Sequence, residues 1–106
     1  MSLEIVNNVD KILGMLNKAK ANGLEAIGLA AEGHAKKECP VDTGTLRNSI
    51  THTHDSNYAY IGTNVEYAPY VELGTSKQKA QPYLKPAATE HSAEYKRLME
   101  SALKNG

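Results

Sequence analysis

A long stretch without proline, from Leu3 to Lys37, constrains the fold more than any other feature of this sequence. Apolar and small residues recur there every three or four positions, the spacing that places side chains on one face of an α-helix. The first half of this stripe carries large side chains and the second half, from Ala19 on, carries small ones. We expect the second half to be the part that packs closely. The stripe consists of Ile5, Val9, Ile12, Leu16, Ala19, Gly23, Ala26, Ala30 and Gly33, widened by Leu13, Leu24, Ile27 and Ala31.

The pair Asn22-Gly23 is the weak point of this predicted helix. Glycine inside a helix costs about 1 kcal/mol relative to alanine. Either the helix bends or breaks there, or it continues for roughly 50 Å at 1.5 Å per residue. A continuous helix would be longer than a domain of this size, so a neighbouring subunit would have to cover its end.

The residues after Pro40, which ends the helical stretch, predict a β-hairpin. Residues 49–54 and 58–63 alternate in polarity, and the turn-forming residues Asp55, Ser56 and Asn57 lie between them, so we expect a three-residue loop. In the first strand His52 and His54 point to the same face.

Residues 67–74 predict a short helical turn, with Pro69 near its start and Gly74 at its exit. A polar loop follows over residues 75–81, and residues 81–86 predict an extended edge strand because two prolines restrict them. Pro86 can open a last helix, from 87 to about 103, packed on the sheet. Its apolar face is formed by Ala88, His91, Tyr95, Leu98 and Ala102.

The predicted fold class is therefore α+β in a single domain spanning residues 1–106. It has a long N-terminal helix, an antiparallel hairpin plus an edge strand, a short helical turn and a C-terminal helix. The chain has no Trp and no Phe, so its core must use Leu, Ile, Val, Ala and Met, with the six Tyr at its margins.

Composition also restricts the partners. The formal net charge is zero, which argues against nucleic-acid binding as the main role. No apolar run is long enough to span a membrane, and the N-terminus lacks the features of a signal peptide. The single Cys39 excludes an intrachain disulfide and fits a reducing compartment, so we expect synthesis in the cytosol.

Candidates for chemistry are weak. Cys39 could be a nucleophile beside His34, but no third group orients the histidine. His52 and His54 could bind a metal only with further ligands, and nothing in the sequence brings His34 and His91 together. The carboxylates are scattered singly and no phosphate-binding loop is present. We therefore expect no catalytic residue, no cofactor and no metal site.

The order of charges along the chain suggests a contact between copies. Acidic residues occur without Lys or Arg from Asn48 to Ser76, and basic residues occur without acids from Leu73 to Thr89. A basic loop of one copy could meet the acidic surface of the next in a head-to-tail contact that closes into a ring. Ordinary solvated surface charge is the alternative. The acidic residues are Asp55, Glu66 and Glu72, and the basic ones, a candidate assembly loop, are Lys77, Lys79 and Lys85.

The distribution of tyrosine residues is a second indication of an interface. Tyr58, Tyr60, Tyr67, Tyr70 and Tyr83 lie in the hairpin and the segments after it. Tyrosine is enriched at interfaces because it combines an apolar ring with a polar tip. The alternative is that these rings surround a small core.

Three motifs resemble one family. They read P-V-D-T-G-T-L-R-N-S from residue 40, Y-A-P-Y-V-E-L-G-T from residue 67, and P-Y-L-K-P-A from residue 82. Their order and spacing are similar to the tail-completion, or head–tail joining, proteins of long-tailed bacteriophages. The family usually has Phe where this chain has Tyr83, and often an aromatic residue where it has Leu73. The motif residues are Pro40, Asp42, Thr43, Gly44, Leu46, Arg47, Tyr67, Ala68, Val71, Glu72, Gly74, Thr75, Pro82, Tyr83 and Pro86.

This resemblance implies a structural virion protein without catalytic residues or cofactor. Such proteins form rings, commonly hexameric, that complete the tail and dock it to the neck, so the implied partners are further copies and the tail-tube and neck or connector proteins. A portal-bound connector or a minor head protein of a phage or prophage is the alternative, and a small cytosolic binding module a more distant one.

The motif residues then need structural roles. We expect Asp42 to cap a turn, Gly44 to permit a tight backbone, Leu46 to anchor the segment in the core, and Arg47 to pair with Glu72. The polar loop over residues 75–81 suits a segment that becomes ordered when it meets a partner.

Overall fold

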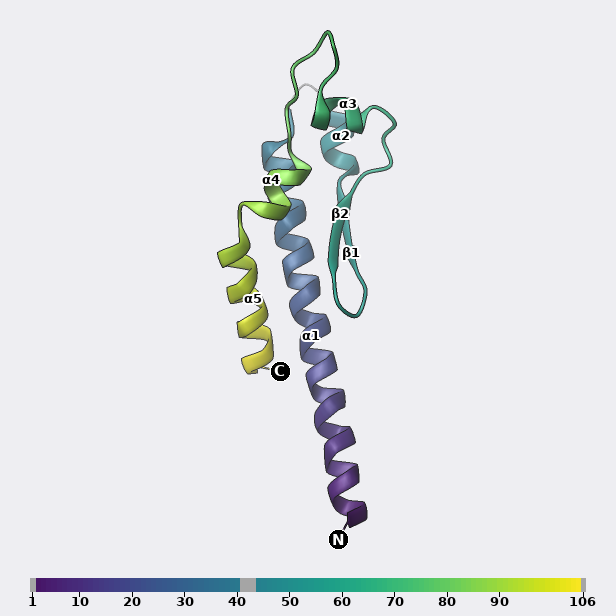
Figure 1. Cartoon of the computed structure of the whole chain (residues 1–106), viewed down its shortest axis with the longest axis vertical. Coiled ribbons are helices and arrows are strands. Elements are labelled where there is room, and N and C mark those ends of the chain that lie inside the picture. Colours follow the sequence, from purple (N-terminus) through teal and green to yellow (C-terminus); the bar gives the residue numbers. More distant parts are fainter. Residues whose placement is uncertain (1, 41–43, 106) are drawn as a thin grey trace.

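The structure is a computed structural model that describes residues 2–40 and 44–105, with side chains from residue 11 on. The molecule is elongated, with extents of 70 × 24 × 21 Å (Figure 1). It has the predicted α+β composition. The elements are α1 (Ser2–Glu38), α2 (Gly44–Ser49), β1 (Thr51–His54), β2 (Ala59–Gly62), α3 (Ala68–Leu73), α4 (Leu84–Thr89) and α5 (Ser92–Asn105).

Helix α1 is continuous over 37 residues, so the chain does not break at Asn22-Gly23. At 1.5 Å per residue its length is about 55 Å. Gly23 lies where the helix meets α5: a Cβ on this residue would be 2.5 Å from the sulfur of Met99. Close packing is found over part of the second half: Ala19, Ala31 and Ala35 are buried, whereas Gly33 is exposed. Glycine at position 23 therefore allows α1 and α5 to pack closely. The helix remains continuous there despite the low helix propensity of glycine.

The predicted β-hairpin is confirmed, and its two strands pair antiparallel from Thr51↔Gly62 to His54↔Ala59. Its loop has four residues, Asp55 to Tyr58, and not the three that we expected. The Asp55 carboxylate accepts hydrogen bonds from the backbone amides of Asn57 and Tyr58, at 2.8 and 2.7 Å. This cap holds Tyr58 in the turn, so the second strand begins one residue later.

The short helix at residues 67–74 is also confirmed, as α3. The predicted edge strand at residues 81–86 is wrong: the sheet in the described chain has two strands, and α4 begins at Leu84. The Glu72 carboxylate accepts hydrogen bonds from the backbone amides of Tyr83, Leu84 and Lys85, at 3.1, 2.8 and 3.2 Å. These amides lie at the start of α4, where a helix has no acceptors of its own. Pro86 lies in the first turn of α4, a position that a proline tolerates.

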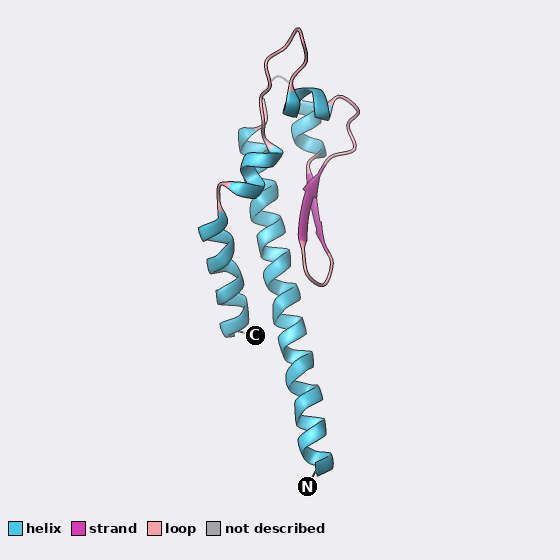
Figure 2. Ribbon diagram, viewed as in Figure 1, coloured by secondary structure: helices cyan, strands magenta, loops and turns pink. Residues whose placement is uncertain are grey.

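The last helix is divided, because α4 ends at Thr89 and α5 begins at Ser92. The hairpin and α5 flank α1 (Figure 2). Helix α5 lies mainly along α1, and it reaches the sheet through Tyr95, which lines a small cavity together with Tyr60 and Ile61. The Tyr95 hydroxyl donates a hydrogen bond to the carbonyl of Ala87, which joins the two C-terminal helices.

The main core lies where the end of α1 meets α2, α3 and α4. Tyr83 is 0% exposed at its centre, so the expectation that tyrosines stay at the core margin is wrong for this residue. The chain has no Phe or Trp, and the tyrosine ring is the largest apolar group available to fill this space. Burial raises the pKa of Tyr83 to about 12, and within the described part of the chain its hydroxyl has no hydrogen-bond partner. The core residues are Ala35, Cys39, Leu46, Ile50, Ala68, Val71, Tyr83 and Ala87.

Candidate functional site

The first half of α1 extends beyond the rest of the molecule and exposes large apolar side chains (Figure 1). We call residues 11–18 the stalk. Ile12, Leu13, Met15 and Leu16 are each 50–55% exposed, whereas Ala19 directly after the stalk is buried. With Leu103 of α5, three of them and Ala19 line a shallow apolar groove of about 120 Å³. Contiguous exposed apolar surface of this kind marks an interaction site in soluble proteins.

A second apolar surface lies at the opposite end of the molecule, around α3. Leu73 is 78% exposed and Tyr70 is 58% exposed. They lie on the short helix that borders an open hollow of about 550 Å³. We call this cavity the hollow; its lining includes Val65, Ala68, Pro69, Leu73 and Leu84.

The first motif lies mainly on α2. Asp42 and Thr43 lie outside the described residues. Leu46 is fully buried in the core, and Pro40 lies at the end of α1. Gly44 opens α2, and a Cβ on this residue would meet no atom of residues 11–40 and 44–105 within 4 Å.

The expected ion pair between Arg47 and Glu72 is wrong for the described chain. Among the ion pairs of residues 11–40 and 44–105, none joins these two side chains. Arg47 is exposed on α2, whereas both oxygens of the Glu72 carboxylate face the first amides of α4. The carboxylate stabilises these amides directly, at the positive end of the helix dipole.

The second motif forms α3 and the turn that leaves it. Ala68 and Val71 are buried, whereas Tyr67 is 40% exposed. Gly74 has φ +77°, and a Cβ there would lie 2.7 Å from the amide nitrogen of Ala80. Only glycine adopts this backbone without strain and leaves room for the returning chain.

The loop over residues 75–81 is closed at its base. The Thr75 amide donates to the Gln78 carbonyl at 2.8 Å, and the Gln81 amide donates to the Val71 carbonyl at 2.8 Å. Lys77 and Lys79 are exposed on this loop, and Lys85 is exposed on α4. Pro82, also exposed, precedes the buried Tyr83.

Two of the three acidic residues predicted to meet this loop accept hydrogen bonds from within the chain. Asp55 accepts two loop amides and the Tyr60 hydroxyl, and these hydrogen bonds lower the pKa of its carboxyl group. Glu72 caps α4. Of the three acids, Glu66 is the one whose carboxylate accepts no hydrogen bond from the described residues. The lowered pKa keeps Asp55 charged near neutral pH, so its hydrogen bonds do not remove it from the acidic surface.

His52 connects the hairpin to α1. Its Nδ1 lies 2.8 Å from Glu32 Oε1, and its Nε2 lies 2.8 Å from Glu25 Oε2. Hydrogen bonds to these two carboxylates raise the pKa of His52, and the His52 hydrogen bond lowers the pKa of Glu32. From the sequence alone, the predicted surroundings of His52 were solvent, a partner protein or a metal ion. The missed signal was the pair of glutamates seven residues apart, which share one face of α1.

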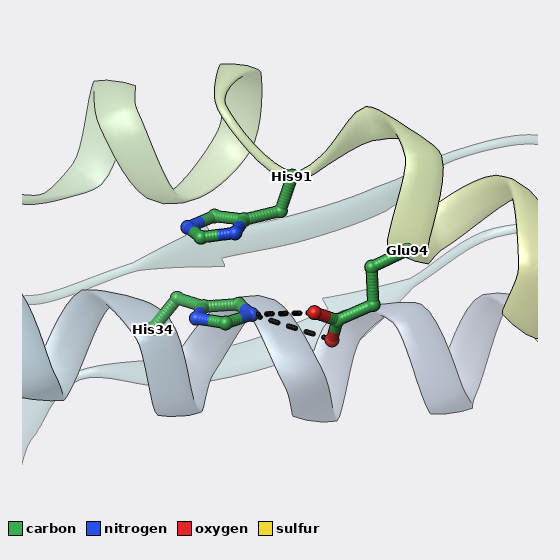
Figure 3. Close-up of side chains that lie close together, drawn as sticks. All are labelled: His34, His91 and Glu94. Atoms are coloured by element: carbon green, nitrogen blue, oxygen red, sulfur yellow. Dashed lines mark hydrogen bonds and ion pairs between the residues drawn. The ribbon is translucent and has the colours of Figure 1, made fainter.

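His34 and His91, which the sequence did not connect, lie together with Glu94 between α1 and the start of α5 (Figure 3). The two imidazole rings stack with centroids 3.6 Å apart and planes 4° apart. The Glu94 carboxylate oxygens lie 3.0 and 3.3 Å from His34 Nε2. Cys39 is buried in the core, away from this pair.

A small α+β fold with an apolar stalk at one end and an apolar hollow at the other suits a protein that contacts other chains. The chain belongs to the HK97-gp10-like family, described as "Bacteriophage HK97-gp10, putative tail-component", whose model matches residues 4–74. The matched region runs from α1 through α3 and includes the first motif and all of the second except Thr75. The chain therefore has a structural role in a tailed phage.

No curated protein and no solved structure matches the chain. Within the described residues, no helix is both long and apolar enough to cross a bilayer.

Proposed function

We propose that this chain is a structural virion protein of the head–tail neck. It forms or joins a ring at the head–tail interface, completes the tail and docks it to the neck, and acts as a single domain over residues 1–106. The family supports a role in the phage tail. The observation that carries the assembly step is the stalk, whose four large apolar side chains remain half exposed in the isolated chain.

Covering the stalk would stabilise the assembly. Burial of apolar surface contributes about 25 cal/mol per Å² removed from water. Helix α5 ends beside the groove and covers only part of it, through Leu103. A second copy is the natural cover, because the hollow at the opposite end also presents apolar side chains. A contact between two different surfaces of identical chains is head-to-tail and closes into a ring when the rotation permits.

The basic loop lies on the same side of the molecule as the hollow and supports this arrangement. Lys77 and Lys79 make no ion pair among the described residues, so they are available to a carboxylate of a neighbouring protein. The charges would then guide docking, while the apolar surfaces provide most of the stability.

The test is the absolute mass in solution of the wild-type protein and two variants, by light scattering over a range of concentration and salt. Leu16→Glu places a charge in the groove. Asn17→Glu adds the same charge at the next position, which does not line the groove. We expect a discrete oligomer near six times 11.5 kDa for the wild type and the control, and a monomer for Leu16→Glu.

A tail-binding measurement separates assembly in solution from assembly on the tail. Wild-type protein added to purified tail tubes should bind at one tube end and stop further growth, and Leu16→Glu should not. If Leu16→Glu matches the wild type in both measurements, the stalk is not the contact. If the wild type is monomeric and also leaves tail tubes unchanged, the proposed function is wrong.

A further inference from the structure

We propose that His34, His91 and Glu94 form a binding site for a divalent transition-metal ion, with Zn²⁺ as the best fit, that fastens the C-terminal helix to α1. One potential ligand atom from each residue lies within 4.8 Å of the other two. His34 comes from α1, His91 lies directly before α5, and Glu94 lies in the first turn of α5, so an ion at this position would link the two helices (Figure 3).

The ligand set has the chemistry that zinc prefers. Two imidazoles and one carboxylate bind Zn²⁺ in proteins and leave a fourth position for water. With bonds of about 2.0–2.2 Å and tetrahedral angles, neighbouring ligand atoms lie roughly 3.3 Å apart. His34 Nε2 already lies 3.0 and 3.3 Å from the Glu94 oxygens. Only the His91 ring must move to complete the set.

The required movement is a rotation of the His91 ring relative to the His34 ring. An ion bound to an imidazole lies in the plane of that ring, and two parallel planes cannot share one ion. The stacked rings, with planes 4° apart, must therefore tilt when the ion binds. The χ2 torsion of histidine is broad, so this rotation has a low cost. The side chains of His34 and His91 are 25% and 27% exposed, which leaves space for it.

A second observation points to the same residues. His91 Nε2 is buried and has no hydrogen-bond partner among the residues that the structure describes. Such a buried polar atom is costly and needs an explanation. Glu38 Oε1 lies 3.9 Å from it. A metal ion on one ring nitrogen leaves the other as an N–H donor, and donation from a metal-bound histidine to a carboxylate is the usual supporting interaction.

Helix α5 would benefit from such a link. The structure describes all of its residues, and none of them is fully buried. Small domains often add a metal ion where the core alone holds an element weakly. His91 and Glu94 lie beyond the family match, which ends at residue 74, so the site is a feature of this chain's own C-terminal segment.

The experiment titrates metal-free protein without a histidine tag with Zn²⁺ alone, by calorimetry and by thermal denaturation. The variants are His91→Asn and Glu94→Gln. The matched control is His54→Asn, which removes a histidine outside the cluster. We expect one ion per chain and a higher melting temperature with Zn²⁺ for the wild type and the control. Each cluster variant should bind at least about tenfold more weakly.

Ring signals of the four histidines in NMR spectra of the wild type provide a second measurement that does not depend on how the variants fold. On adding Zn²⁺, the signals of His34 and His91 should shift in step with saturation, while those of His52 and His54 stay in place. The proposal is wrong if binding does not saturate, if His91→Asn binds as tightly as the wild type, or if His52 and His54 are the residues that shift.

Discussion

The two halves of α1 differ in the size of their side chains and in what surrounds them. In the second half, Ala19, Ala31 and Ala35 are buried against the hairpin and the C-terminal helices. In the stalk, Ile12, Leu13 and Leu16 are half exposed. One end of this continuous helix is thus closely packed within the chain. The other end exposes apolar surface to solvent. The helix thus buries several of its small residues and leaves the large residues of the stalk exposed.

The same contrast appears between the core and α3. Leu46 and Tyr83 fill the interior completely, whereas Tyr70 and Leu73, a few residues from the buried Val71, remain exposed. The stalk and α3 lie at opposite ends of a molecule 70 Å long (Figure 1). Substitutions at matched positions in the two kinds of region should therefore have different consequences.

The largest difference is expected between two leucines. Leu46→Ala removes a fully buried side chain and should lower the free energy of unfolding by about 2–5 kcal/mol. Leu16→Ala, at a half-exposed stalk position, should lower it by less than about 1 kcal/mol in the monomer. Urea denaturation of both variants measures this. An equal loss at the two positions would show that the stalk belongs to the fold.

Replacing two glycines of α1 with alanine should change the free energy of unfolding in opposite directions. A Cβ at Gly28 would lie 2.9 Å from His52 Cδ2 and would push the hairpin away, so Gly28→Ala should destabilise by about 1–3 kcal/mol. A Cβ at Gly14 in the stalk meets nothing within 4 Å. Gly14→Ala should stabilise by up to about 1 kcal/mol through helix propensity. Thermal denaturation distinguishes the two, and a gain at both positions would show that the hairpin does not press on α1.

A smaller gain is expected from the core tyrosine. The Tyr83 hydroxyl is buried and none of the described residues forms a hydrogen bond with it, so Tyr83→Phe should raise the free energy of unfolding by about 1 kcal/mol. Tyr70→Phe, on the exposed face of α3, is the control and should change it by less than about 0.5 kcal/mol. Chemical denaturation compares the two. Destabilisation by Tyr83→Phe would mean that the hydroxyl has a partner.

The smallest effect is a pH dependence of the contact between the hairpin and α1. The folded pKa of His52 is raised, so its contribution is complete below the unfolded value, near ~6.5, and is lost as pH rises through the folded pKa. The folded pKa of Glu32 is lowered, so its contribution is present above the unfolded value, near ~4.3, and is lost as pH falls through the folded pKa. Stability from this contact should therefore be greatest between these two values.

His52→Gln tests this dependence. Denaturation midpoints of the wild type should fall from pH 6 to pH 9 more than those of the variant, while His54→Gln should follow the wild type. Parallel curves for all three proteins would show that His52 is not charged in the folded state.

The sequence predicts several elements because their determinants are local. The spacing of apolar residues defines α1, the alternation around Asp55 defines the hairpin, and Pro69 with Gly74 defines α3. Even the closer packing in the second half of α1 follows from side-chain size alone. The hairpin loop is one residue longer than predicted, because the capping carboxylate of Asp55 moves the start of the second strand by a residue.

The errors have a different origin. Residues 81–86 have the composition of an edge strand, but Glu72, more than ten residues earlier, supplies the hydrogen bonds that start α4 there. Because the Glu72 carboxylate accepts these hydrogen bonds, Glu72 does not pair with Arg47. Asp55 likewise accepts hydrogen bonds within the hairpin, from two loop amides and the Tyr60 hydroxyl.

The sequence by itself determined the long helix, the hairpin, the short helix after it and the resemblance to a phage tail family, because periodicity, turn residues and motifs are read within a few consecutive positions. Only the tertiary structure decided that His52 joins Glu25 and Glu32, that Tyr83 fills the core, and that His34 meets His91 and Glu94. These contacts join residues far apart in the chain, and their partners are fixed by how whole elements pack.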